Sequence, residues 1–97
     1  GKKKQRLAVY ARAFSHPARI SILKILAKKK SCNCNELVKH LPLSQSTVSQ
    51  HLKELKNSGL INAETLGTSS MYSLNKIAVT AFEKDFKRLL KTIKAKK

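Results

Sequence analysis

Two thiols separated by one residue, Cys32 and Cys34, are the side chains whose type and spacing most directly suggest chemistry. In an extended or pre-helical segment, residues i and i+2 lie on one side, so both sulfurs could contact one thiophilic metal ion. On a regular helix they point about 200° apart and could not. Lys28 to Lys30 nearby would favour thiolates, but a tetrahedral zinc site needs further ligands from elsewhere in the fold or from a second subunit. The residues alone therefore favour two small structural cysteines over a metal sensor.

The remaining ionisable residues do not form a catalytic arrangement. Five carboxylates are scattered along the chain, and the histidines at 16, 40 and 51 have no spacing with cysteine or aspartate that suggests a triad. His16 precedes Pro17 at a helix start, where packing or capping is expected. His51 borders an apolar stripe and is expected to be a structural hydrogen-bonding residue. We predict that the protein is not an enzyme and requires no cofactor.

The composition predicts one domain with a polyanionic partner. The 97 residues, 41% of them hydrophobic, suffice for a single domain over residues 1–97 with a modest core. Twenty-one Lys and Arg against five Asp and Glu give a net charge of +16, which favours nucleic acid first and an anionic membrane surface second. No uncharged apolar run has the length of a membrane span. Two cysteines do not make a secreted disulfide scaffold, so a reducing cytoplasm is the expected compartment.

The stretch from Leu43 to Ile61, LSQSTVSQHLKELKNSGLI, organises the predicted fold. Ser44 suits a helix N-cap and Gly59 suits a helix end. Apolar residues at i, i+4 and i+7 form one stripe, and short polar side chains with a lysine occupy the opposite face. Such side chains can reach base edges and phosphates without carboxylate repulsion, although a merely solvated face is the alternative. The residues expected to contact DNA are Ser44, Gln45, Ser46, Thr47, Ser49, Gln50 and Lys53.

A short helix from about Asn35 to Leu41, ended by Pro42, precedes this stretch with a connection of about three residues. This is the helix-turn-helix pattern, whose second helix can lie in a DNA major groove. After Gly59, two strand-like runs separated by GTSS predict a β-hairpin, the wing of a winged helix. The hairpin tip has no Arg or Lys and follows Glu64. The charge that attracts DNA is therefore expected from lysines of the second and last helices and from a frayed basic tail, residues 1–6.

Helices are also predicted over residues 4–14 and 75–95, and a strongly apolar core helix begins at Ser15-Pro17. Apolar residues in the last helix are spaced 3, 4, 3, 4, which is an a/d seam that needs a partner. The seam could fold back onto residues 4–14 or pair with a second chain, and we favour a homodimer because a two-fold DNA reader needs one. The seam consists of Val79, Phe82, Phe86, Leu89 and Ile93. The predicted fold class is mainly α with a small β-hairpin, a winged helix-turn-helix.

Three motifs between about Tyr10 and Leu74 carry a family resemblance: FSHPARISIL, CNCNELVKHLPLSQSTVSQHLKELKNSGLI and G…Y.L. Over this range the chain resembles the arsenic-repressor (ArsR/SmtB) family of winged-helix regulators. The resemblance implies a homodimeric bacterial transcription factor, usually a repressor, that acts in the cytoplasm at the nucleoid. It also implies that the first and last helices form the dimer interface and that the helix after Ser44 enters the major groove.

The same resemblance bears on the cysteines. Cys32 and Cys34 match the family's Cys-x-Cys inducer pair by position, but the further thiol expected three residues on is replaced by Leu37. The family's second sensing site, Asp and His on the last helix, is absent because residues 75–97 contain no histidine. The resemblance puts an inducer site at Cys32 and Cys34 on an equal footing with a structural role, without choosing among arsenite, cadmium, zinc and a redox signal.

The sequence thus predicts a dimeric, sequence-specific repressor of a two-fold symmetric double-stranded DNA operator, released when a thiophilic metal or an oxidant engages Cys32 and Cys34. One alternative is a sequence-tolerant basic nucleic-acid-binding protein of architectural type with structural cysteines, which would show almost no preference for a specific site. Peripheral membrane binding through the last helix is not favoured, since its apolar seam is too narrow.

Overall fold

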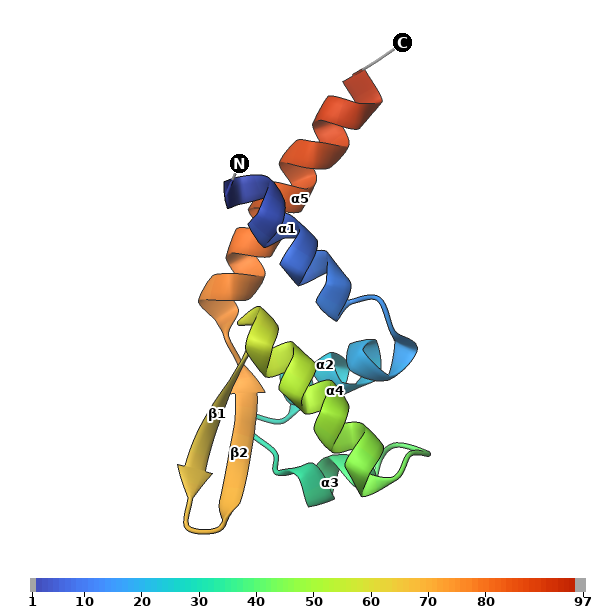
Figure 1. Cartoon of the computed structure of the whole chain (residues 1–97), viewed down its shortest axis with the longest axis vertical. Helices are drawn as coiled ribbons and strands as arrows, with labels where there is room; N and C mark the ends of the chain where they lie inside the picture. Colours follow the sequence, from blue (N-terminus) through green and yellow to red (C-terminus); the bar gives the residue numbers. More distant parts are fainter. Residues whose placement is uncertain (1, 96–97) are drawn as a thin grey trace.

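A computed structural model describes residues 2–95, and its helices and strands follow the order expected for a winged helix-turn-helix (Figure 1). Four helices precede a two-stranded antiparallel hairpin, and one long helix follows it. The predicted fold class is confirmed. The elements are α1 (Lys2–Ala13), α2 (Pro17–Lys28), α3 (Cys34–Val38), α4 (Gln45–Ser58), β1 (Ile61–Leu66), β2 (Ser69–Leu74) and α5 (Lys76–Ala95).

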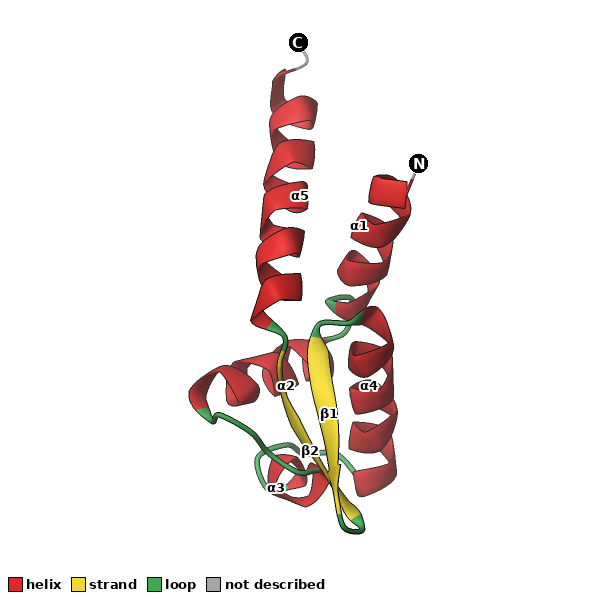
Figure 2. Cartoon of the chain, turned by 90° about the vertical axis from the view of Figure 1, so that its left-hand side faces the viewer, coloured by secondary structure: helices red, strands yellow, loops and turns green. Residues whose placement is uncertain are grey.

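The N-terminal residues are helical rather than a frayed tail. α1 begins at Lys2, so the expectation of a basic tail over residues 1–6 is wrong for residues 2–6, while Gly1 lies outside the described residues. An ion pair accounts for the difference, because Arg6 Nη2 donates to Asp85 Oδ2 of α5 at 2.8 Å. Leu7, the next residue, is half-buried. These contacts hold the start of α1 beside α5 (Figure 2).

The core lies where α2, α3 and α4 meet the base of the hairpin. α4 buries its predicted stripe completely, since Val48, Leu52 and Leu55 are at most 1% exposed. Because these side chains cannot leave the core without a large hydrophobic cost, they decide which face of α4 points to solvent. The other core residues are Ala13, Ile22, Leu26, Cys32, Leu37, Leu60, Ile61 and Ala78.

The hairpin is joined to the helical part of the fold by a short backbone bridge. β1 and β2 pair antiparallel, with Ile61 opposite Leu74 at one end and Leu66 opposite Ser69 at the other. Gly67 adopts a positive φ of +65° in the turn. Cys32 N donates to Tyr72 O at 3.0 Å, and Tyr72 N donates to Cys32 O at 2.8 Å. The bridge links the segment before α3 to β2 and so fixes the wing relative to the helix-turn-helix.

The apolar seam of α5 divides between two environments. Phe82 packs against α1, with its ring centroid 4.9 Å from that of Phe14 and 5.9 Å from that of Tyr10. Phe86 stacks on Phe82 at 5.2 Å but remains 39% exposed. Phe82 therefore packs within the chain, whereas the other seam residues stay exposed: Val79, Phe86, Leu89 and Ile93. Among the described residues, no helix is long and apolar enough to cross a membrane.

Candidate DNA-binding interface

The outward face of α4 presents the polar side chains that the sequence assigned to DNA contact. Ser46, Ser49, Gln50 and Lys53 are all exposed, opposite the buried stripe. Within the described part of the chain, no hydrogen bond or ion pair engages the side chains of Ser49, Gln50 or Lys53. Their donors and acceptors are available to an external partner.

One of the predicted contact residues, Ser44, is the N-cap of α4. Ser44 Oγ accepts from the Thr47 amide at 3.3 Å and donates to Thr47 Oγ1 at 2.9 Å. Ser46 Oγ lies 3.2 Å from Ser44 Oγ. Thr47 is half-buried, whereas Ser44, Gln45 and Ser46 are exposed. The structure therefore places six of the seven predicted residues on α4 and the seventh, Ser44, at its N-cap, and the contacts of Ser44 with Thr47 hold the first turn.

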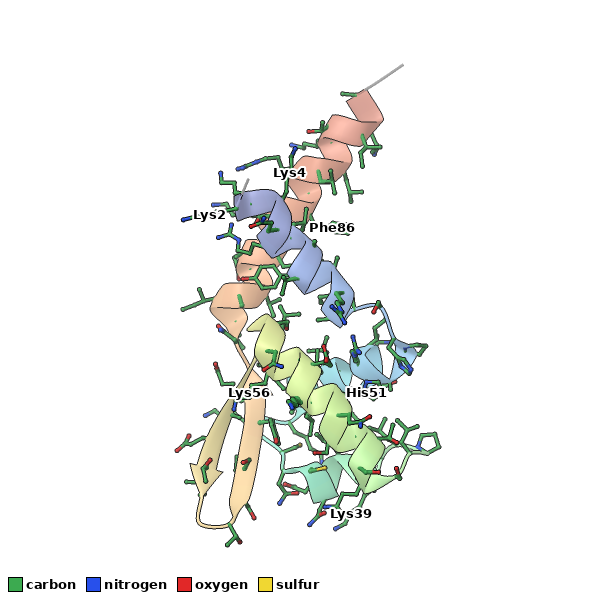
Figure 3. All side chains as sticks on the ribbon, viewed as in Figure 1. Lys2, Lys4, Lys39, His51, Lys56 and Phe86 are labelled. Carbon is green, nitrogen blue, oxygen red and sulfur yellow. The ribbon has the colours of Figure 1, made fainter. Side chains whose placement is uncertain are left out.

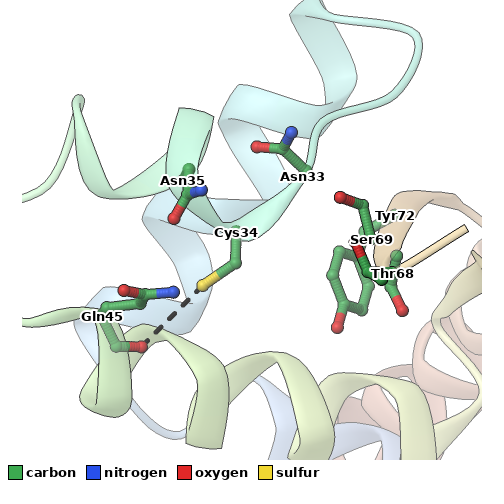
Figure 4. Close-up of a pocket in the computed structure, with 8 residues that line it drawn as sticks. Asn33, Cys34, Asn35, Gln45, Thr68, Ser69 and Tyr72 are labelled. Carbon is green, nitrogen blue, oxygen red and sulfur yellow. Dashed lines mark hydrogen bonds between the residues drawn. The ribbon is translucent and has the colours of Figure 1, made fainter.

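A polar cavity of about 220 Å³ lies between the start of α3, the start of α4 and the hairpin (Figure 4). Cys34 and Gln45, the first residues of α3 and α4, meet at this cavity. The Cys34 thiol donates to the Gln45 carbonyl with a sulfur–oxygen distance of 3.8 Å. Cys34 is thus in direct contact with the backbone of α4. The lining residues are Asn33, Cys34, Asn35, Gln45, Thr68, Ser69, Ser70 and Tyr72.

The two cysteines occupy different environments. Cys32 is fully buried, and Cys34 is half-buried. Burial raises the pKa of both thiols, and Glu36 raises the pKa of Cys32 further. The expectation that Lys28 to Lys30 favour thiolates is wrong in its net effect, because Lys29 lowers the pKa of Cys32 by less than burial raises it. In the described part of the chain, no group of three or more Cys, His, Asp or Glu could hold a metal ion.

A cluster of two histidines and an arginine joins three helices. His16 caps α2, because its Nδ1 accepts from the Ala18 amide at 3.1 Å. Arg19 donates through Nε to His51 Nδ1 at 3.2 Å and through Nη1 to the Arg12 carbonyl at 2.9 Å. The two imidazole centroids lie 4.5 Å apart. These contacts confirm the capping role of His16 and the hydrogen-bonding role of His51, and they tie α4 to α1 and α2.

The sequence did not predict this cluster as a unit. The sequence shows only a His-Pro pair followed by Arg19 and, far along the chain, His51 at the border of the α4 stripe. Packing of the helices alone brings these residues together. Both rings accept at Nδ1, so each neutral ring carries its proton on Nε2. Burial lowers the pKa of His51, and His16 and Arg19 lower it further, while Glu54 acts in the opposite direction.

Basic side chains are distributed unevenly over the molecule. α4 carries two lysines and one glutamate, and the hairpin strands carry one glutamate and no basic residue, so this surface has no net charge. Lys28 to Lys30 are exposed at the end of α2. Lys2 and Lys4 of α1 lie toward the opposite end of the molecule from the start of α4, beside α5 (Figure 3). The cations at the start of α1 therefore lie away from the start of α4 within one chain.

The fold and this surface define a winged helix-turn-helix DNA-binding protein. A family model described as "Bacterial regulatory protein, arsR family" matches residues 16–63. The arsenical resistance operon repressor of Staphylococcus xylosus is 35% identical over 69 residues, which cover 71% of this chain and 65% of that protein. The HTH-type transcriptional regulator YgaV of Escherichia coli K12 is 34% identical over 77 residues, which cover 79% of this chain and 78% of that protein.

Solved structures agree with this match. HlyU from Vibrio cholerae N16961 is 27% identical and superposes with a TM-score of 0.70 over 98% of each chain. An ArsR-like transcriptional regulator from Rhodococcus sp. RHA1, 21% identical, shares the fold with a TM-score of 0.84 over 98% of this chain and 89% of that one. The chain belongs to the arsR family of bacterial regulatory proteins. It is a DNA-binding transcriptional regulator and not an enzyme.

The lowered pKa of His51 predicts acid-sensitive stability. Above its ordinary pKa of 6.5, His51 is neutral in both the folded and the unfolded chain. As the pH falls below that value, the unfolded chain takes up a proton at His51 before the folded chain does. The folded state therefore loses stability until the pH reaches the lowered pKa of His51 in the folded chain. We expect the free energy of unfolding to decrease between pH 7 and 5.5, and His51→Gln, which keeps an acceptor for Arg19, to make that decrease smaller. Urea unfolding at several pH values measures both slopes. Equal slopes for parent and variant would contradict this role.

Proposed function

We propose that this protein represses transcription as a homodimer that reads a two-fold symmetric DNA operator with α4. The observation that carries the proposal is the exposed face of α4, where Ser49, Gln50 and Lys53 have no partner in the described part of the chain. The side-chain NH2 of a glutamine can donate to adenine N7 while its carbonyl oxygen accepts from the adenine N6 amino group, so Gln50 matches the N6–N7 pair of adenine. Such a repressor works in the cytoplasm, at the nucleoid.

Two further features support reading by α4. The start of α4 and the hairpin turn lie toward the same end of the molecule, as a recognition helix and its wing must to face one duplex (Figures 1 and 2). Several relatives are named as repressors, including the arsenical resistance operon repressor of Staphylococcus xylosus and the SmtB repressor of Mycobacterium tuberculosis. An architectural binder with no sequence preference would not need an uncharged set of hydrogen-bonding groups on this face.

Replacing Gln50 separates base reading from phosphate attraction. We expect Gln50→Ala to weaken binding to the selected operator by about 1–3 kcal/mol and to leave binding to random duplex nearly unchanged. Lys29→Ala, the matched control, should weaken both and lower the salt slope by about one unit. The measurement is a titration of both variants on an operator selected from random DNA and on an unrelated duplex at several salt concentrations. Equal losses for Gln50→Ala on the two duplexes would favour the sequence-tolerant binder.

The proposed dimer interface is the uncovered half of the α5 seam. Phe86 and Leu89 are each 39% exposed and Ile93 is 58% exposed, and Leu90 joins them on the same side of the helix. Phe82, by contrast, is already packed against α1, so it supports the interface from behind through its stacking on Phe86. A contiguous apolar surface of this kind is characteristic of a protein–protein contact.

A charge in this surface should prevent dimerisation. We expect the parent to sediment as a dimer and Phe86→Glu as a monomer, since pairing would bury an unpartnered carboxylate. Ile77→Glu is the matched control, because Ile77 is 84% exposed on a different face of α5 and its replacement should leave the dimer intact. A parent that remains monomeric at high micromolar concentration, or a control that dissociates equally, would contradict the assignment.

Members of this family respond to metal ions as effectors. We propose that in this protein Cys32 and Cys34 together bind such a metal ion or react with an oxidant. The Cys34 sulfur contacts the backbone of Gln45, so a ligand on that sulfur must disturb the first turn of α4. Cys32 carries the bridge to Tyr72, so a shared ligand would also strain the attachment of the wing. The further ligands of a metal must come from a second chain or from solvent, since the described part of this one offers no third.

If these thiols bind the effector, the double variant Cys32→Ser, Cys34→Ser should keep its affinity for DNA but no longer dissociate from DNA when metal or oxidant is added. The reason is that the effector can no longer bind preferentially to a state of the protein that does not bind DNA. The raised pKa of both thiols means that a metal must displace their protons at neutral pH, so metal affinity should increase with pH. DNA release during titration with arsenite, cadmium, zinc or peroxide at two pH values measures both effects. A parent that stays bound under every condition would assign the cysteines to the core.

A further inference from the structure

The positive charge of this protein is concentrated away from its DNA-reading surface. α1 carries five cations and no carboxylate, and α5 carries six cations and two carboxylates, so these two helices hold nine of the sixteen net positive charges. α4 and the hairpin strands together hold none. The molecule is 52 Å long, and the far ends of α1 and α5 lie toward one end of it while the hairpin turn and the start of α4 lie toward the other (Figure 1).

Four lysines form one row along α5, spaced 3, 4 and 3 residues apart. At about 100° per residue they fall within a sector about 80° wide and span about 15 Å of the helix. All four are exposed, and among the described residues Lys87 alone of them has a carboxylate within ion-pair distance, that of Glu83 at 3.6 Å. We call this set the lysine row: Lys84, Lys87, Lys91 and Lys94.

The lysine row continues into further cations without crossing the apolar seam. Arg88 follows it around α5 and shares a shallow surface hollow with Lys3 and Lys4 of α1. Asp85, in the same hollow, is already paired with Arg6. The exposed seam lies on the opposite side of α5 from the lysine row, so pairing of two chains through the seam would leave the row open to solvent. The hollow of Arg88 borders the seam, because Leu89 also lines it.

We propose that the lysine row, with Arg88 and the α1 lysines, is a second binding surface that takes the phosphodiester backbone of duplex DNA. The exposed cations of this row, of which Lys87 alone has a carboxylate nearby, repel one another, and a polyanion relieves that repulsion. This surface supplies attraction that does not depend on base sequence, whereas α4 supplies discrimination. The phosphates could belong to the operator itself, beyond the part under α4, or to a second duplex. The proposal goes beyond operator reading by α4 and does not depend on it.

The test uses the full chain and a 30-base-pair duplex of random sequence, so that base reading does not contribute. Replacing all four residues of the lysine row by Gln should reduce the slope of log affinity against log salt by about three to four units, since each phosphate contact contributes about 0.9. Replacing the same four residues by Arg should preserve the slope, because the charge is retained. A slope unchanged by the Gln replacements would overturn the proposal.

A charge-matched pair guards against a general loss of net charge and against misfolding of the fourfold variant. Lys84→Gln with Lys91→Gln should lower the slope by about two units, whereas Lys24→Gln with Lys56→Gln, exposed lysines on α2 and α4, should lower it much less. Equal reductions in the two pairs would overturn the assignment to α5.

Two duplexes labelled with donor and acceptor dyes identify the source of the phosphates. Energy transfer that the parent supports and the fourfold Gln variant does not would assign the lysine row to a second duplex. A lowered slope without energy transfer would assign it to the same duplex, and both results support the surface. Failure of this proposal can be told apart from failure of operator reading by α4. Gln50→Ala tests operator reading through the affinity for the operator, and it should leave the salt slope on the random duplex unchanged.

Discussion

Burial of one side of α4 is the constraint on which the rest of this structure depends. Val48, Leu52 and Leu55 are removed from water almost completely, and each such side chain contributes about 1.5–3 kcal/mol relative to exposure. α4 cannot rotate about its axis without giving up much of this free energy. The hydrogen-bonding face is therefore held outward by the core itself, and the fold needs no interaction among the residues of that face to orient them.

Three local contacts then set the position of α4 relative to its neighbours. The contact between Arg19 and His51 holds the middle of the helix against α2, and the contact between Cys34 and the Gln45 carbonyl touches its first residue. The bridge between Cys32 and Tyr72 fixes the wing to the same body. Cys32 and Cys34 lie two residues apart and contact the wing and α4 respectively, so a change at this Cys-Asn-Cys segment reaches both elements that we propose to face DNA. An effector bound at the proposed cysteine site would therefore have a short physical route to α4.

The charges of the protein are separated from its recognition groups. Hydrogen-bonding groups such as those proposed to read DNA on α4 can discriminate among bases because they have directions, whereas lysines attract any phosphate. The absence of net charge on α4 and the hairpin strands would limit non-specific attraction at the proposed reading surface. The cations instead gather on α1 and α5, where the ion pair between Arg6 and Asp85 and the stacking of Phe82 hold two basic helices side by side.

The sequence by itself determined the elements and the two faces of α4, because helix caps, apolar periodicity and Gly59 are local signals that the core does not oppose. It also determined the class of protein, through the length and order of the helix-turn-helix and hairpin. Tertiary packing decided what depends on distant residues. It made residues 2–6 helical through Arg6 and Asp85, divided the α5 seam at Phe82, and brought Arg19 to His51. It also reversed the expected effect on the thiols, since burial of Cys32 outweighs the nearby lysines, and burial is a property of the packed chain rather than of neighbours in sequence.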